Sequence, residues 1–220
     1  MIKVAIVDDH QLFRKSLSLL VASCDGISVE LDTNDGLLFL EQLENIEIDV
    51  LLLDLEMPII NGYEVCKKAK FIDPNLKVII VSQITSKEAV HHVMEIGANG
   101  YLTKNSSPEM LENAIKNVVD KDYYFDIALS SVLREALLWK KKPTTLSDST
   151  DVYFTPREIH IIKLAIKEKS SKEMADLLHT SIRTIEKHRT NIMEKTQSKN
   201  FIGVILFALR AKIVDLDTLF

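Results

Sequence analysis

Cysteine is scarce in this sequence, and long apolar runs are missing. Cys24 and Cys66 are the only cysteines among 220 residues, and neither has the spacing of a metal-ligand set. No apolar run approaches the roughly 18 residues that a membrane-spanning helix needs. The opening stretch IKVAIVD predicts a strand rather than a signal peptide. We therefore expect a cytoplasmic protein with reduced thiols, and neither a disulfide scaffold nor a membrane protein.

Charge is unevenly distributed along the chain. Residues 1–128 hold 11 Lys and Arg against 21 Asp and Glu, a net charge of −10, and residues 129–220 hold 16 against 11, a net charge of +5. With 220 residues, the chain is long enough for two globular domains. An acidic half joined to a basic half indicates a regulatory or catalytic unit attached to a polyanion binder, with drift in surface charge as the alternative.

The first 125 residues alternate apolar runs with helical patterns. Strands are expected at 3–8, 27–31, 49–54, 78–82 and 100–103, and helices at about 11–23, 36–44, 62–71, 87–96 and 108–120. Five such units predict the α/β class, with a doubly wound five-stranded parallel sheet covered by helices on both faces. In such folds the working site lies beyond the carboxyl ends of the strands.

The second half of the chain predicts a different architecture. An amphipathic helix is expected at 127–142, followed by a linker rich in Ser, Thr and Asp at 143–151. From residue 152 onward the patterns are all helical. We therefore expect a first domain at 1–122, a connecting helix and linker at 123–151, and an all-α four-helix domain at 152–220.

Several polar residues follow the expected strands at their carboxyl ends. The first strand ends in Asp8 and Asp9, the third in Asp54 and the fourth in Ser82, and Lys104 comes at the end of the fifth. Because parallel neighbours align their ends, these side chains are expected on one rim. Crowded carboxylates need a cation, and hard oxygen ligands suit Mg²⁺. The set suits a site that stabilises a phosphoryl group in transfer to Asp54.

Each of these residues also has an ordinary structural explanation. The acids, together with His10, could cap the helix or loop that follows each strand. Ser82 could be a cap as well, and Lys104 could be a solvated side chain. The four strand ends taken together, in sequence order, favour a single site over coincidence.

The motifs VDDH, LLLDLEMPIINGYE, IIVSQIT and GANGYLTKN resemble the receiver domain of bacterial response regulators over residues 1 to about 122. The resemblance implies a flavodoxin-like fold, with Asp54 as the phosphoacceptor that takes a phosphoryl group from a sensor histidine kinase. It implies that Asp8, Asp9, Asp54 and the backbone carbonyl of Glu56 hold Mg²⁺.

The same resemblance assigns a switch pair. The Ser82 hydroxyl would move to the phosphoryl group, and the ring of Tyr101 would turn inward into the space released. The chain departs from many receivers at two positions. Asn105 stands where proline is common, and Gln83 stands where a small residue is frequent.

Capping motifs mark the expected starts of the helices in the second half of the chain. Thr155 with Glu158, and Ser170 with Glu173, have the spacing of capping boxes, and Ser181 or the next residue begins a third helix. A fourth apolar helix is expected at 202–212. Two short helices joined by a tight turn predict a helix-turn-helix, whose second member enters the major groove of DNA.

The third helix of this domain has two faces. Ile185, Ile192 and the His188 side are expected to face the core. The outward face carries polar groups that can reach phosphates or base edges, and Lys172 lies where a phosphate would meet a helix N-terminus. The alternative is an ordinary solvated face. The outward residues are Arg183, Glu186, Lys187, Thr190 and Glu194.

The motifs TPRE, SSKEMADLL and TIEKHRTNIMEK are similar to the LuxR-type helix-turn-helix domain over about 152–214. Together with the receiver they identify the chain as a member of the NarL/FixJ family. The resemblance implies a homodimer, paired through the fourth helix, on an inverted repeat in double-stranded DNA. With Lys172 from the pattern above, the DNA contacts expected are Lys172, Arg183, Thr184, Glu186, Lys187 and Thr190.

Three functions are weighed on these grounds. The preferred one is a phosphorylation-controlled transcription regulator that is not an enzyme, apart from phosphotransfer to its own Asp54 and slow self-dephosphorylation. The second is an aspartyl-phosphate phosphatase with Glu56 as acid or base, which would need a substrate-covering cap. The third is a regulator governed by protein partners, with its acidic corner unused.

Overall fold

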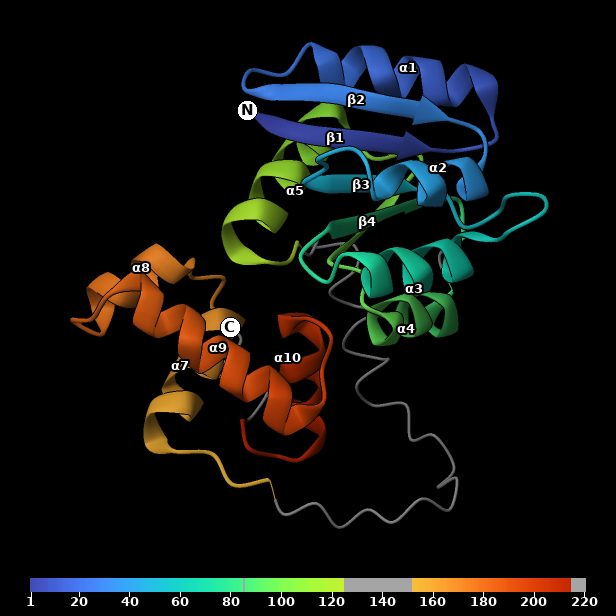
Figure 1. Cartoon of the computed structure of the whole chain (residues 1–220). Helices are drawn as coiled ribbons and strands as arrows, with labels where there is room; N and C mark the ends of the chain where they lie inside the picture. The colour runs from blue at the N-terminus through green and yellow to red at the C-terminus, as the bar shows by residue number, and fades with distance from the viewer. Residues whose placement is uncertain (85, 125–151, 215–220) are drawn as a thin grey trace, which may run out of the picture.

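The computed structural model describes residues 1–84, 86–124 and 152–214 (Figure 1). The expected connecting helix at 127–142 and the linker at 143–151 lie outside the described residues, as do residues 215–220. Within the described ranges, none of the helices combines the length and the hydropathy that crossing a membrane requires.

Five parallel strands form the centre of the N-terminal domain (Figure 1). The central strand, β3, is buried along its whole length, as expected for a strand covered by helices on both faces. The order β2-β1-β3-β4-β5 confirms the predicted doubly wound sheet. The strands are β1 (Ile2–Val7), β2 (Ile27–Thr33), β3 (Val50–Leu53), β4 (Lys77–Ser82) and β5 (Gly100–Thr103).

Helices cover both faces of the sheet. One buried cluster joins the sheet to α1 (Gln11–Ala22) and α5 (Pro108–Lys121). A second cluster joins the opposite face to α2 (Gly36–Leu43), α3 (Gly62–Ile72) and α4 (Lys87–Ile96). The strand and helix bounds agree with those expected from the sequence to within two residues.

Four helices form the described part of the C-terminal domain: α7 (Pro156–Ile166), α8 (Ser171–Leu177), α9 (Ile182–Thr196) and α10 (Phe201–Arg210). Both expected capping boxes are formed, with each N-cap hydroxyl bonded to the N3 backbone and each N3 glutamate bonded back. Ser181 caps α9 by accepting a hydrogen bond from the backbone N–H of Thr184. The predicted all-α domain is therefore confirmed.

One lysine of α3, Lys70, has a buried side chain. The Lys70 ammonium donates hydrogen bonds to the carbonyl of Leu76 at 2.6 Å and to Oδ1 of Asn99 at 2.8 Å. Burial lowers the pKa of Lys70 to about 8, and the nearby charge of Lys77 adds to this. Asn99 also donates to the carbonyl of Asp122 at 2.7 Å, so the lysine belongs to a network that reaches the end of α5.

This buried lysine makes stability depend on pH. Because its pKa is lower in the folded state than in the unfolded chain, folding disfavours the charged form, and this cost disappears as the pH rises from about 8 to about 10.5. Relative to Lys70→Met, the wild-type protein should gain about 2 kcal/mol of unfolding free energy between about pH 7 and pH 10. Urea denaturation at each pH measures this difference.

Lys68→Met is the matched control, since Lys68 is exposed on the same helix. Its difference from wild type should stay constant over the same pH range. Parallel pH profiles for the wild-type protein and Lys70→Met would contradict the assignment of a charge cost to this buried site.

Candidate functional site

The sheet register places two aspartates side by side. Val7 of β1 pairs with Leu53 of β3. Asp8 and Asp54 are the next residues after this pair on the two strands. The backbone N–H of Asp54 donates to the carbonyl of Val7 at 2.9 Å, which extends the ladder to the site. Asp8 and Asp54 are both about 2% exposed. The expected meeting of the first and third strand ends is therefore observed.

A lysine from the far edge of the sheet reaches both acids. β4 and β5 pair Ser82 with Thr103, and the N–H of Lys104 donates to the carbonyl of Ser82 at 3.1 Å. The Lys104 ammonium lies 2.7 Å from Oδ2 of Asp54 and 2.8 Å from Oδ2 of Asp8. The ammonium thus bridges the two carboxylates.

Burial sets the electrostatics of this bridge. Desolvation raises the pKa of the Asp8 carboxyl above its usual range, and the hydrogen bond from Lys104 opposes that rise. For Lys104, burial disfavours the charged form, but hydrogen bonds to Asp54 and Asp8 outweigh it and raise its pKa. Lys104 is therefore a fixed positive charge at the carboxyl edge of the sheet.

The acids of this rim form a set that could hold a divalent ion. One ligand atom each from Asp8, Asp9, His10 and Asp54 can be chosen so that all lie within 4.8 Å of one another. Oδ1 of Asp9 is buried and accepts no hydrogen bond from any described residue. Carboxylate oxygens with one acceptor unsatisfied match the preferences of Mg²⁺. The donor set therefore fits the ion that the sequence predicts.

Helix capping was the alternative explanation for the residues at this corner. His10 is the N-cap residue of α1, but its side chain makes no capping hydrogen bond. Instead, Oδ1 of Asp8 accepts a hydrogen bond from the N–H of His10 at 2.8 Å. Nδ1 of His10 lies 3.3 Å from Oδ1 of Asp9. The α1 N-cap is therefore not formed by a side chain, and Asp8 binds the backbone of the N-cap residue instead.

Ser82 and Tyr101 are connected through the backbone of Ile84. The Tyr101 hydroxyl donates to the carbonyl of Ile84, and the N–H of Ile84 donates to Oγ of Ser82 at 3.3 Å. Tyr101 is fully buried, and burial raises its pKa to about 12 against the opposing effect of the Ser82 hydroxyl. The ring therefore already occupies an inward position, and Ile84 is a participant that the sequence did not single out.

Two further residues frame the rim. Arg14 of α1 is buried and donates to the carbonyl of Asp8 at 2.6 Å and to Oδ1 of Asp32 at 2.7 Å, so it positions the backbone at Asp8. No sequence motif pointed to Arg14. The side chain of Glu56, two residues after Asp54, is exposed. The expected use of the Glu56 backbone carbonyl as a metal ligand remains a prediction.

A second candidate functional surface lies on α9. The side chains predicted to contact DNA are all exposed, and five of them lie on α9 while Lys172 lies at the start of α8. α8 packs against α9, as the two helices of a helix-turn-helix do. The five residues on α9 are Arg183, Thr184, Glu186, Lys187 and Thr190.

Both halves of the chain match described protein families. A model of the response regulator receiver domain matches residues 4–116, and a model of bacterial regulatory proteins of the luxR family matches residues 152–208. The oxygen regulatory protein NreC of Staphylococcus epidermidis is 30% identical over 216 residues, which is 97% of this chain and 99% of that protein.

The chain belongs to the NarL/FixJ family of response regulators. NreC of Staphylococcus aureus is also 30% identical, over the same shares of the two chains. This family member thus combines a receiver domain with a LuxR-type DNA-binding domain.

Solved structures of response regulators share the fold. RcsB of Salmonella typhimurium is 21% identical, with a TM-score of 0.57 over 94% of this chain and 98% of that chain. An RcsB–DNA complex gives 20% identity and a TM-score of 0.57 over 95% and 98% of the two chains. The agreement supports the fold of this NarL/FixJ protein.

One prediction about α9 needs correction. Ile185 and Ile192 are fully buried as expected, but the residue buried between them is Arg189, at 3% exposure, and not His188, which is half-buried. Arg189 is four residues after Ile185 and three before Ile192, so helical periodicity already placed it on the inner face. The sequence pattern had been used to assign neither face of the helix to Arg189, so its burial is a finding of the structure.

Proposed function

We propose that Asp54 is the phosphoacceptor of this response regulator and that a sensor histidine kinase is the donor. The observation that carries the proposal is the Lys104 ammonium bridging Asp54 and Asp8 beside the unsatisfied oxygen of Asp9. A carboxylate nucleophile next to a fixed cation and an oxygen-rich metal site is suited to phosphoryl transfer. The work of the protein is proposed to take place in the cytoplasm, as the sequence predicts.

The residues have separate roles in this transfer. An Asp54 oxygen attacks phosphorus, and the bond from phosphorus to the kinase histidine nitrogen breaks. Asp8, Asp9, Asp54 and the carbonyl of Glu56 would hold Mg²⁺, which supplies charge neutralisation for the phosphoryl oxygens. Lys104 transfers its contact from the free carboxylate to a phosphoryl oxygen.

The switch pair then responds to the new acyl phosphate. The Ser82 hydroxyl turns from the N–H of Ile84 toward a phosphoryl oxygen. Tyr101 is held by the carbonyl of the same Ile84, so displacement of that backbone unit reaches the ring as well. A charge event at Asp54 is thereby converted into a change of packing on β5 and α4.

The second domain reads double-stranded DNA. α9 enters the major groove, with Arg183, Thr184, Lys187 and Thr190 as contacts and Glu186 as a base reader. Lys172 meets a phosphate at the start of α8. Two copies, paired through α10, bind an inverted repeat as a homodimer.

We propose no catalytic turnover beyond phosphorylation and slow self-dephosphorylation of Asp54. A phosphatase would need a cap over the acidic rim, whereas the second half of this chain matches a DNA-binding family. Incubation with a small phosphate ester should give no continuing release of phosphate. Multiple turnover would revive the enzyme hypothesis.

Lys187→Ala tests the proposed DNA contact. The exposed ammonium on α9 is placed to reach a phosphate or a guanine edge, so its loss should weaken DNA binding by about 10-fold and reduce the salt slope by about 1. Fluorescence anisotropy over a salt series measures both quantities. Lys68→Ala on the receiver is the control, and an unchanged affinity in Lys187→Ala would exclude this face of α9.

The experiment that tests the whole proposal is a selection of bound duplexes from random DNA, with and without acetyl phosphate and magnesium. Phosphorylated protein should enrich an inverted repeat more strongly than the unphosphorylated protein. Enrichment that is independent of acetyl phosphate in wild type and in Asp54→Asn would favour a regulator governed by partners alone.

A further inference from the structure

Arg14 is a charged residue on the buried side of α1. It lies three residues before Leu17 and seven before Val21, so helical spacing places all three on the face that covers the sheet. Leu17 and Val21 belong to the apolar cluster on that face, whereas Arg14 is only 8% exposed and carries a permanent charge. Burial of a guanidinium is costly unless its N–H groups find acceptors. The identity of those acceptors therefore indicates the role of the residue.

The Arg14 guanidinium joins the ends of two strands. Nη1 donates to the backbone carbonyl of Asp8 at 2.6 Å, and Nε donates to Oδ1 of Asp32, on β2, at 2.7 Å. The ammonium of Lys15 contacts Oδ2 of the same carboxylate at 2.9 Å. Burial alone would raise the pKa of the Asp32 carboxyl, but the hydrogen bonds from Lys15 and Arg14 outweigh it and lower that pKa. Arg14 is thus anchored on a charged carboxylate while it holds the Asp8 carbonyl.

The Asp8 carbonyl governs the direction of Asp9. The peptide unit between the two residues is planar, so a fixed carbonyl also fixes the N–H and the Cα of Asp9. The carboxylate oxygens of Asp8 are held as well, by the N–H of His10 at 2.8 Å and by the ammonium of Lys104 at 2.8 Å. Oδ1 of Asp9 is buried and has no hydrogen-bond partner among the described residues. Arg14 therefore fixes the backbone from which that unsatisfied oxygen is presented.

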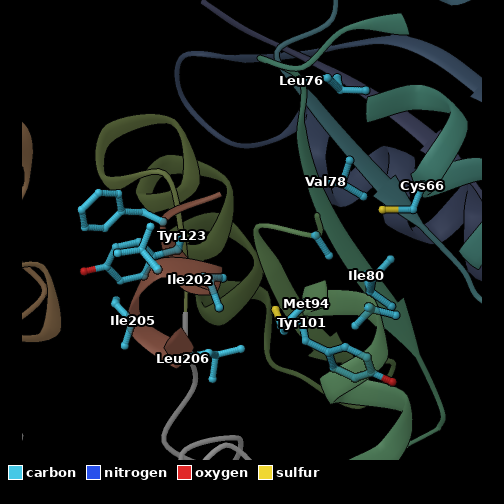
Figure 2. Close-up of a cluster of buried hydrophobic side chains, with 14 of the residues drawn as sticks. Cys66, Leu76, Val78, Ile80, Met94, Tyr101, Tyr123, Ile202, Ile205 and Leu206 are labelled. Carbon is cyan, nitrogen blue, oxygen red and sulfur yellow. The ribbon is translucent and has the colours of Figure 1, made fainter. Parts of the chain in front are cut away.

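Arg14 lies on the side of the sheet opposite the switch residue Tyr101. Tyr101 packs in the cluster that contains Ile80 of β4 and Met94 of α4 (Figure 2). That cluster covers the face of the sheet on which α2, α3 and α4 lie, whereas α1 covers the other face. A change at Arg14 therefore leaves the packing of Tyr101 in place, and its effects can be assigned to the acidic cluster.

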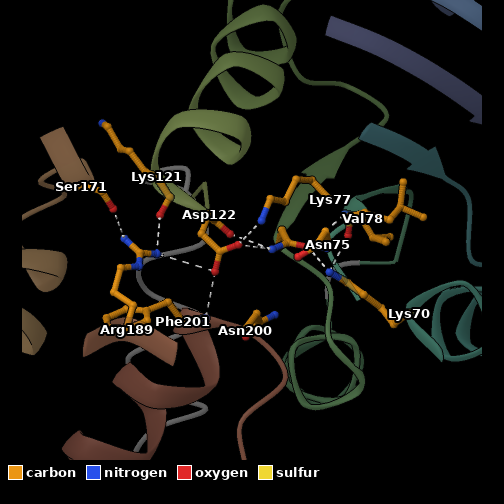
Figure 3. A network of polar contacts seen from close by, with 12 residues as sticks. Lys70, Asn75, Lys77, Val78, Lys121, Asp122, Ser171, Arg189, Asn200 and Phe201 are labelled. Atoms are coloured by element: carbon orange, nitrogen blue, oxygen red, sulfur yellow. Dashed lines mark hydrogen bonds and ion pairs between the residues drawn. The ribbon is translucent and has the colours of Figure 1, made fainter. Parts of the chain in front are cut away.

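Two other cations on helices, Lys70 and Arg189, are also buried. Lys70 bonds the side chain of Asn99 at the amino end of β5, and Arg189 bonds the carbonyl of Lys121 at the end of α5 (Figure 3). In the described part of the chain, neither contacts the acids at the carboxyl ends of the strands. The place of Arg14 beside those acids is therefore not shared by the other two.

We propose that Arg14 is a positioning residue for the metal site, which holds the peptide between Asp8 and Asp9 so that both carboxylates are aligned for Mg²⁺. The inference rests on the proposed function, because it takes Asp8 and Asp9 as Mg²⁺ ligands. Groups that orient metal ligands contribute about 10-fold or more to metal affinity. Since a cation near the site repels Mg²⁺, the contribution of Arg14 comes from orientation and not from its charge.

Charge and orientation predict opposite effects of removing Arg14. Arg14→Met takes away a positive charge, so electrostatics alone would strengthen Mg²⁺ binding. Loss of orientation would weaken it instead. Lys15→Met is the matched control, since the Lys15 ammonium pairs with the same Asp32 from an exposed position and, among the described residues, bonds no other group.

Titration of the unphosphorylated full-length proteins with magnesium chloride, followed by the amide resonances of Asp8 and Asp9 in ¹H–¹⁵N NMR spectra, measures Mg²⁺ affinity without any transfer step. Arg14→Met should bind Mg²⁺ about 10-fold more weakly than wild type, and Lys15→Met should stay within about 2-fold. Unchanged or tighter binding in Arg14→Met would overturn the inference.

Phosphorylation by acetyl phosphate separates metal binding from phosphoryl transfer. The Mg²⁺ concentration that gives half the maximal rate should rise about 10-fold in Arg14→Met, while the rate at saturating Mg²⁺ should stay within about 2-fold of wild type. A lower saturating rate at wild-type Mg²⁺ affinity would show that Arg14 acts on the transfer itself, which contradicts the inference.

Arg14→Lys decides the matter if urea denaturation shows that Arg14→Met does not fold. Lysine keeps the positive charge but lacks the planar fork that reaches the Asp8 carbonyl and Asp32 together. Its Mg²⁺ affinity should be about 3-fold weaker than that of wild type. Wild-type affinity in Arg14→Lys would then overturn the inference.

Failure of the proposed function gives a different result. If Mg²⁺ shifts no amide resonance near Asp8, Asp9 and Asp54 in the wild-type protein, the metal site of the proposed function fails and the inference fails with it. If wild type binds Mg²⁺ and Arg14→Met binds it equally well, only the role of Arg14 is excluded.

Discussion

Asp54→Asn should abolish phosphorylation of the protein by acetyl phosphate and magnesium. The substitution keeps the shape of the side chain but replaces the nucleophilic carboxylate with an amide, which cannot form the acyl phosphate. It also removes one of the two acids bridged by Lys104 and one ligand atom of the acidic cluster. Phosphate-affinity electrophoresis should show a slower band for the wild-type protein and none for the variant.

Asp25→Asn is the control for this result. Asp25 is an exposed carboxylate in the turn before β2. It lies at the amino ends of the strands, whereas Asp54 lies at their carboxyl ends. Its loss should leave phosphorylation unchanged. A phosphorylated band of wild-type intensity in Asp54→Asn would place the acceptor on another residue.

Gly62→Ala should destabilise the receiver severely. Gly62 is the first residue of α3, and its N–H donates to the carbonyl of Leu55 at 3.0 Å. A Cβ atom there would lie 2.0 Å from the backbone oxygen of Asp54 and 2.7 Å from Cα of Leu55. These are backbone atoms, which cannot rotate away, so the loop carrying Asp54 must move. We expect a loss of about 3 kcal/mol or more of unfolding free energy, measured by urea denaturation.

Gly100→Ala provides the comparison within the same sheet. Gly100 is buried in β5, but a Cβ atom there would have no neighbour closer than 3.5 Å. Its unfolding free energy should change by less than about 1 kcal/mol. Equal effects of the two substitutions would mean that the close approach of α3 to Asp54 does not constrain the fold.

The acidic rim was predictable because it depends on local patterns and one rule of sheet geometry. The apolar runs predicted that strands end near Asp8, Asp54 and Lys104. Parallel pairing brings the carboxyl ends of strands to the same side of a sheet. The helix starts at Thr155 and Ser170 could be predicted equally well, because a capping box is a motif of four consecutive residues.

The contacts between the domains could not be predicted in this way. The bond from Asn200 to Ala98 joins residues 102 positions apart, and the bond from Arg189 to Lys121 spans 68. Such pairs leave no periodic signal in a single sequence. The burial of Arg189 had a signal in its helical position, but the meaning of that burial depended on Asp122, which only the folded chain brings near.

The central claim is that a phosphoryl group on Asp54 controls DNA binding. The most direct measurement is the affinity of phosphorylated and unphosphorylated full-length protein for the selected DNA across a salt series, with Asp54→Asn alongside. Phosphorylated wild type should bind about 10-fold more tightly or better at each salt concentration, and Asp54→Asn should not respond to acetyl phosphate. Equal affinities of the two wild-type forms throughout the series would contradict the account.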